Sequence, residues 1–81
     1  MKYIVTEQDD GTKEIFVFSR DIDHDKMAIS INRIISGNKL RWNRIKRTPV
    51  SAGFVAQGEC YGRSETLNLD SVESDRELLP L

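Results

Sequence analysis

A basic stretch, KLRWNRIKRTP from Lys39 to Pro49, holds the residue types that could bind a polyanion. Five of its first nine residues are Lys or Arg, and Trp42, the only tryptophan, lies among them. Cationic side chains attract phosphates, and an exposed indole can stack on a base. The alternative, which we favour, makes Trp42 a core residue and leaves the cations at a solvated edge or paired with acids. The candidate contact residues for nucleic acid or for a partner are Arg33, Lys39, Arg41, Trp42, Arg44, Lys46 and Arg47.

The charge of the chain is divided along its length, although the net charge is only −1. Residues 1–25 carry seven acids and three bases, residues 26–47 carry seven bases and no acid, and residues 48–81 carry six acids and two bases. Acidic segments on both sides can therefore neutralise the basic one, depending on how the chain folds.

Three alternating acids, Asp21, Asp23 and Asp25, resemble the first ligands of a calcium loop. The remainder of that pattern is missing, since Lys26 stands where the loop needs Gly and Asn32 where it needs Glu. Acids at this position suit the start of a helix, where side-chain oxygens cap free N–H groups. We therefore predict no metal site and a capped helix instead.

Few other residues could carry out catalysis. His24 is the only histidine, and no serine or cysteine partner lies at a spacing that would form a triad with it. Cys60 is the only cysteine, so we interpret it as a small buried apolar residue. The stretch from Gly62 to Thr66 lacks the final glycine of a nucleophile elbow. We predict a protein that is not an enzyme and has no catalytic or cofactor-binding residues.

The first half of the chain predicts a hairpin followed by a helix. Lys2–Glu7 and Lys13–Ser19 are rich in β-branched and aromatic residues, and Asp9-Asp10-Gly11 between them favours a turn. From about Asp23 to Ser36, apolar residues recur at helical spacing. Their positions are Met27, Ile31, Ile34 and Ile35, and His24 falls on the same side, at the helix start.

The second half predicts further strands. The expected strands are 40–47, 50–56 and 59–61, with a break at Thr48-Pro49, a short alternation over 66–69 and a helical turn in SDRELL. The predicted fold class is α+β: a small antiparallel sheet, ββαββ with a candidate fifth strand, and one helix packed on one face. We expect a single domain over residues 1–81, in which about 70–81 form a C-terminal tail.

The second strand is apolar on both faces, with Ile15 and Val17 on one and Phe16 and Phe18 on the other. One helix covers only one face of a sheet, so something else must cover the second. Two alternatives remain open: a second copy of the chain, which would give a homodimer, or the C-terminal leucines. Those leucines are Leu67, Leu69, Leu78, Leu79 and Leu81.

Several segments resemble small uncharacterised proteins encoded by tailed phages and prophages. These segments are PVSAGFV at 49–55, GECYGRSETLNLDS at 58–71, and the upstream DHDKMA and RWNRI. The resemblance covers most of the chain, and it implies a cytoplasmic setting in a bacterial host and an accessory, non-structural role. It assigns no functional residue.

The size and composition agree with such a protein. The chain has 81 residues, 38% hydrophobic and 31% charged, and it has neither an apolar run of membrane-spanning length nor a signal-peptide core at its N-terminus. We expect a cytoplasmic protein without cofactors or membrane contact, which acts by binding a macromolecule. A protein is the first choice of partner, and nucleic acid bound by residues 39–47 is the alternative.

Overall fold

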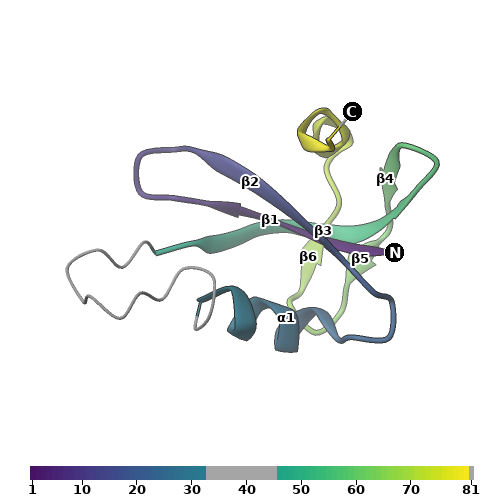
Figure 1. Cartoon of the computed structure of the whole chain (residues 1–81), viewed down its shortest axis with the longest axis horizontal. Helices are drawn as coiled ribbons and strands as arrows, with labels where there is room; N and C mark the ends of the chain where they lie inside the picture. The colour runs from purple at the N-terminus through teal and green to yellow at the C-terminus, as the bar shows by residue number, and fades with distance from the viewer. Residues whose placement is uncertain (33–45, 81) are drawn as a thin grey trace.

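The computed structural model describes residues 1–32 and 46–80 (Figure 1). The predicted strand at 40–47 lies almost wholly outside this part, as do Arg33, Lys39, Arg41, Trp42 and Arg44. In chain order the elements are β1 (Lys2–Glu7), β2 (Lys13–Phe18), α1 (His24–Ser30), β3 (Thr48–Ala56), β4 (Glu59–Tyr61), β5 (Arg63–Ser64), β6 (Leu69–Asp70) and the 3-10 helix η3 (Glu73–Leu78).

A four-stranded antiparallel sheet in the order β2-β1-β3-β4 forms the centre of the structure, and β5 and β6 pair as a small second sheet. The helix α1 lies on one side of the large sheet and η3 on the other (Figure 1). The predicted α+β class is confirmed, and so are the strand at 59–61 and the helical turn near the C-terminus.

The hairpin between β1 and β2 closes through a turn that depends on glycine. The Gly11 N–H donates to the Gln8 carbonyl at 2.9 Å, and the Gln8 N–H donates to the Thr12 carbonyl at 2.9 Å. Gly11 has a φ of 88°, which glycine adopts without steric cost. This geometry is a three-residue loop ending in a left-handed residue, a common hairpin connection. The register from Glu7↔Lys13 to Lys2↔Phe18 then runs without a shift.

The start of α1 differs from the capping prediction. Asp23 is the N-cap, but its side chain makes no capping hydrogen bond. Free N–H groups of the first turn find other acceptors: the Asp25 N–H donates to Thr66 Oγ1 at 3.3 Å, and the Lys26 N–H donates to Asp25 Oδ1 at 2.9 Å. The loop between β5 and β6 therefore supplies a cap that the local sequence did not indicate. The predicted helix end at Ser36 lies outside the described residues.

The predicted break at Thr48-Pro49 is wrong, because both residues belong to β3. Pro49 lies opposite Thr6 of β1, and the register shifts between Val5 and Thr6, which leaves Val50 as the extra residue of a bulge. A proline lacks the N–H of a ladder, so strands accept it at bulges and at their first residues. Among the described residues, β4 pairs with β3 only at Phe54, Val55 and Ala56. No described strand therefore lies beside Pro49 on that side and needs an N–H group from it.

The two faces of the sheet are covered differently. Toward α1 lies the apolar core, which consists of Ile4, Phe18, Ala28, Ile31 and Ala52. Leu67 and Leu69 pack against this core, so the prediction that they cover the opposite face is wrong. On the opposite face, η3 packs across the sheet and contacts both β2 and β4. The C-terminal segment thus covers the second face.

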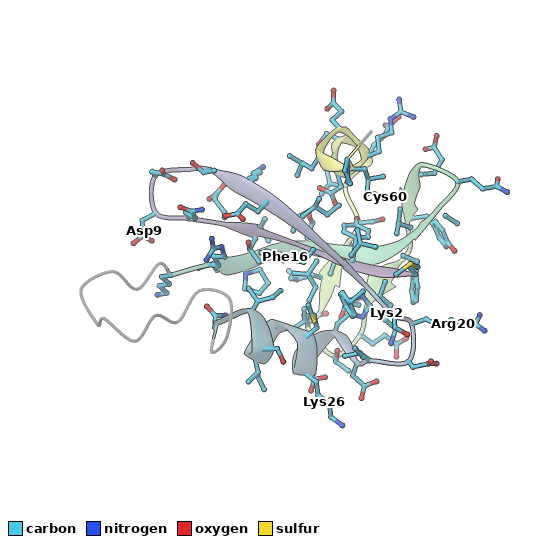
Figure 2. All side chains as sticks on the ribbon, viewed as in Figure 1. Lys2, Asp9, Phe16, Arg20, Lys26 and Cys60 are labelled. Atoms are coloured by element: carbon cyan, nitrogen blue, oxygen red, sulfur yellow. The ribbon has the colours of Figure 1, made fainter. Side chains whose placement is uncertain are left out.

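A buried hydrogen bond attaches η3 to the sheet. The Tyr3 hydroxyl donates to Asp75 Oδ2 at 2.6 Å, and the same oxygen accepts the Val72 N–H at 3.0 Å. Burial of Tyr3, together with the hydrogen bond and the charge of Asp75, raises the pKa of the phenol. Figure 2 shows Phe16 on the α1 side of the sheet and Cys60 at the β4 end. Cys60 is half-buried, not fully buried as predicted, and burial raises the pKa of its thiol.

Candidate functional site

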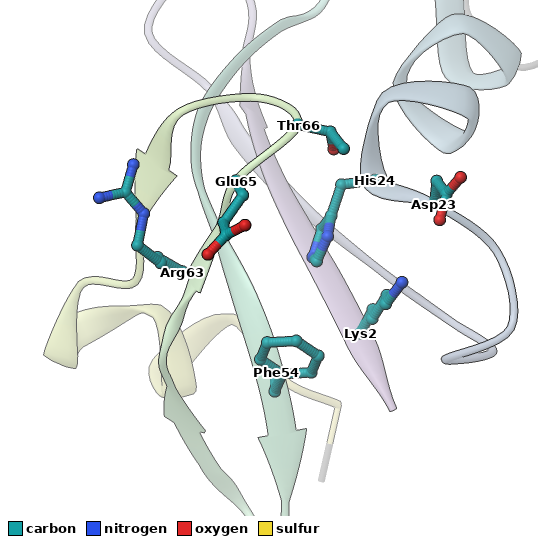
Figure 3. Close-up of a pocket in the computed structure, with 7 residues that line it drawn as sticks. All are labelled: Lys2, Asp23, His24, Phe54, Arg63, Glu65 and Thr66. Atoms are coloured by element: carbon teal, nitrogen blue, oxygen red, sulfur yellow. The ribbon is translucent and has the colours of Figure 1, made fainter.

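A pocket of about 410 Å³ opens between the start of α1, the sheet and the loop between β5 and β6 (Figure 3). It combines two aromatic rings with side chains of both charges. Its lining residues are Lys2, Asp23, His24, Phe54, Arg63, Glu65 and Thr66.

His24 is held in this pocket by one hydrogen bond and two aromatic contacts. Its side chain is buried, with 4% of the residue exposed, and Nε2 lies 2.9 Å from the Gly53 carbonyl oxygen. Because a carbonyl only accepts, Nε2 carries the hydrogen of this bond. The imidazole also makes edge-to-face contacts with Phe18 and Phe54, at centroid distances of 5.5 and 5.8 Å. The prediction that His24 lies on the apolar side at the helix start is confirmed, and its burial is more complete than expected.

The cations of the pocket are engaged in local contacts. Lys2 Nζ donates to the Ile22 carbonyl at 3.0 Å, and Arg63 Nη2 donates to Asn68 Oδ1 at 2.6 Å. Ser64, which is buried beneath the same loop, accepts the Leu67 N–H through Oγ at 3.2 Å. These contacts fix the loop that lines the pocket. The Thr66 hydroxyl, which lines the same pocket as His24, accepts the Asp25 N–H at 3.3 Å.

Metal ligands do not gather at this pocket or elsewhere in the described part of the chain. Across residues 1–32 and 46–80, no three His, Cys, Asp or Glu side chains lie close enough together to hold an ion. Of the alternating acids, Asp25 accepts the Lys26 N–H through Oδ1 in the first turn of α1, and Asp23 makes no capping hydrogen bond.

Two of the predicted contact residues, Lys46 and Arg47, lie within the described ranges. Lys46 is exposed, whereas the Arg47 side chain is only 10% exposed. Arg47 Nε and Nη2 each lie 3.0 Å from Glu14 Oε1, so the guanidinium pairs with an acid of β2. For this residue the alternative of pairing with an acidic flank is confirmed. Contact of the whole basic set with nucleic acid or a protein stays a prediction.

The free edge of β2 is the second candidate site. In the described part of the chain β2 pairs with β1 alone, so one of its sides has no strand beside it. Since Gln8 and Thr12 form a hydrogen-bonded pair that closes the hairpin, the antiparallel alternation fixes the direction of each backbone group. Glu14, Phe16 and Phe18 bond toward β1. The N–H and C=O groups of Lys13, Ile15 and Val17 therefore point outward.

This edge is regular, and its last four residues are apolar. It has six residues, no proline and no register shift against β1, and Val17 is 39% exposed. Natural edge strands are usually short, bulged, charged or interrupted by proline, which prevents pairing with other chains. Only Lys13 and Glu14, next to the turn, follow that practice. Four apolar residues from Ile15 to Phe18 follow them without interruption.

The sequence predicted the hairpin and the two apolar faces of β2, but not its position at the edge. That position depends on which strand pairs with the other side of β1, and β3 does so from more than forty residues further along the chain. No local signal in KEIFVF distinguishes an edge strand from a central one, except that its continuous apolar run is unusual for an edge.

Comparisons with protein-family models, with curated proteins and with solved structures give no match to this chain. Of the helices in the described part, none has the length and apolar character needed to cross a membrane. The fold and the two candidate sites are therefore the basis for a functional proposal.

Proposed function

We propose that this chain is a small non-enzymatic accessory protein that binds another protein through the free edge of β2. The observation that carries the proposal is the run of outward backbone groups at Lys13, Ile15 and Val17 on a strand whose last four residues are apolar. Such an edge offers both hydrogen bonds and apolar contacts to an added strand. Edge pairing of this kind is a recurrent mode of protein recognition.

The geometry of the pocket supports a binding role over a chemical one. A general base needs a free nitrogen within reach of a substrate, and a buried His24 that donates to the Gly53 carbonyl offers little access. The neighbouring cations Lys2 and Arg63 hold the surrounding loops. We therefore assign the residues around this pocket to the fold.

A protein partner also agrees better with Arg47 than a nucleic acid does. Binding to phosphates relies on cations that can leave their local contacts, and Arg47 is largely buried against Glu14. The cytoplasmic bacterial setting and the phage-type accessory role rest on the sequence resemblance alone, and we keep them as part of the proposal.

The test compares the natural chain with two variants of one edge residue. Val17→Pro removes an outward N–H, which β1 does not use, and Val17→Thr keeps the N–H and the β-branched shape. Each chain is immobilised at equal density and exposed to a bacterial lysate, and the bound proteins are quantified by mass spectrometry. We expect a protein bound by the natural chain and by Val17→Thr to be lost with Val17→Pro. Equal capture by all three chains contradicts the proposal.

A further inference from the structure

We infer that the edge of β2 pairs with the same strand of a second copy, antiparallel about a two-fold axis that passes beside Phe16. This inference rests on the proposed function and names its partner. The pairing would join two four-stranded sheets into one continuous sheet of eight strands.

The backbone restricts the registers that such a pair can adopt. Only odd-numbered residues of β2 direct their N–H and C=O groups outward, so odd residues must face odd residues of the second copy. A two-fold axis between the two copies then passes beside Glu14, Ile15, Phe16 or Val17. In each case the side chains of the two copies point to matching sides, because even residues of both copies face the α1 layer.

Charge, apolar contact and the length of the pairing select one of these four registers. An axis at Val17 pairs only residues 16–18 of the two strands, whereas an axis at Phe16 pairs residues 14–18. An axis at Glu14 places two carboxylates directly opposite each other, which is destabilising. An axis at Ile15 places Glu14 beside Phe16 of the second copy, next to the centre of the pair. An axis at Phe16 pairs Phe16 with Phe16 and Ile15 with Val17 on both sides, so all three central pairs are apolar, and Glu14 lies opposite Phe18 only at the two ends. Aromatic and β-branched cross-strand pairs are the favourable ones.

The surroundings of β2 also suit a second copy. Val17 lines an apolar hollow of about 380 Å³ together with Leu79 and Pro80, which lie beyond η3. In the register about Phe16, Ile15 of the second copy lies directly opposite Val17, at the border of this hollow. The same surface is used by both copies, as a two-fold interface requires. Apolar side chains on the η3 side of one copy thereby come close to the apolar side chains on the η3 side of the other copy.

The first experiment measures the mass of the full chain in solution by sedimentation equilibrium over a range of concentrations. We expect the natural chain and Val17→Thr to approach twice the chain mass, and Val17→Pro to remain at the mass of one chain with an unchanged circular dichroism spectrum. A monomeric natural chain overturns the inference. A dimer that persists in Val17→Pro overturns it as well, since the contact must then lie elsewhere.

A second experiment tests the register. Phe16→Cys is introduced into Cys60→Ser, so that the new thiol is the only one, and Ile15→Cys in the same background is the control. Opposed Phe16 residues form a non-hydrogen-bonded pair, whose Cα atoms lie about 4.5 Å apart, within disulfide range. We expect mild oxidation to cross-link Phe16→Cys at least about tenfold faster than Ile15→Cys. Faster cross-linking of Ile15→Cys overturns the axis at Phe16.

Failure of this inference can be told apart from failure of the proposed function. A monomeric chain that still captures a lysate protein, and loses it in Val17→Pro, keeps the edge as a protein-binding site and removes the second copy as its partner. A monomeric chain whose capture does not depend on Val17 contradicts both.

Discussion

The two edges of the main sheet, β2 and β4, are built in opposite ways. β4 has three residues between Gly58 and Gly62, both at a φ of 77°, and its Glu59 pairs with Arg76 of η3 at 3.2 Å. A short, charged strand that is bounded by turns is a poor template for pairing with another strand. The edge of β2 is twice as long, and its last four residues are apolar. Among the described residues, these protective features occur at the β4 edge and not along Ile15 to Phe18 of β2, a difference that supports the proposed binding at β2.

The largest loss of stability should come from a change on the inner side of β2, the side whose backbone groups bond to β1. Phe16→Pro removes an N–H that bonds to β1 as well as an aromatic ring packed against the core. We expect a loss of about 3–5 kcal/mol in the free energy of unfolding, mostly from the ring and partly from the ladder bond. Urea unfolding followed by circular dichroism measures it. A variant as stable as the natural chain would show that the inward and outward assignment of β2 is wrong.

The next largest loss of stability should come from the hydrogen bond that attaches η3 to the sheet. The 3-10 helix η3 contacts both β2 and β4. Tyr3→Phe removes the donor to the buried carboxylate of Asp75 and leaves the Val72 N–H as the remaining donor to Oδ2. We expect a loss of about 1.5–3 kcal/mol, the range for hydrogen bonds to charged groups. Thermal unfolding at neutral pH measures it, and Tyr61→Phe, at an exposed tyrosine of β4, is the matched control.

Tyr3 also imposes a pH dependence. Burial and Asp75 raise the pKa of Tyr3 above its ordinary value of 10.0. A raised pKa means that the folded chain holds the proton more tightly, so this contribution to stability is complete below about pH 10 and is lost as the pH rises further. We expect the natural chain to lose stability more steeply than Tyr3→Phe between pH 9 and 11. Parallel pH profiles in urea unfolding would contradict this assignment.

The β4 edge should depend on Gly53. A Cβ atom at this position would meet the Tyr61 carbonyl oxygen at a distance far below contact, and the Ser71 Cβ at 3.2 Å. Gly53→Ala must therefore push β4 outward, at a cost of about 1–3 kcal/mol. The matched control is Gly58→Ser, whose added Cβ meets no atom but takes a strained φ. If Gly53→Ala changes stability no more than Gly58→Ser does, β4 is not held as closely as described.

The smallest effect on stability should come from the outer side of β2. Val17→Pro removes an N–H that no described residue of the chain uses, so we expect a change within about 1 kcal/mol at concentrations where the chain is a monomer. Thermal unfolding in dilute solution measures it. A loss as large as that of Phe16→Pro would erase the distinction between the two sides of the strand.

Local patterns predicted most of the elements but not their partners. The predicted alternation over 66–69 is wrong, because residues 65–68 form a turn and β6 begins at Leu69, and the short strand β5 was not predicted. The hairpin, the helix start and the strand at β3 follow from alternation, turn residues and helical spacing close to each segment. The helix cap by Thr66 and the packing of Leu67 on the core depend on residues about forty positions away. The pairing of Arg47 with Glu14 and the edge position of β2 likewise depend on which strands meet. The bulge that admits Pro49 arises only once β3 pairs with β1.

Amide hydrogen exchange along β2 tests the open edge most directly. The Phe16 amide bonds to β1 and serves as the internal reference, whereas the Ile15 and Val17 amides point outward. We expect the protection of Ile15 and Val17 to rise with protein concentration toward that of Phe16, as an added strand covers them. Exchange of both amides at a fast rate that does not change with concentration, or upon addition of any captured protein, would contradict an edge used for binding.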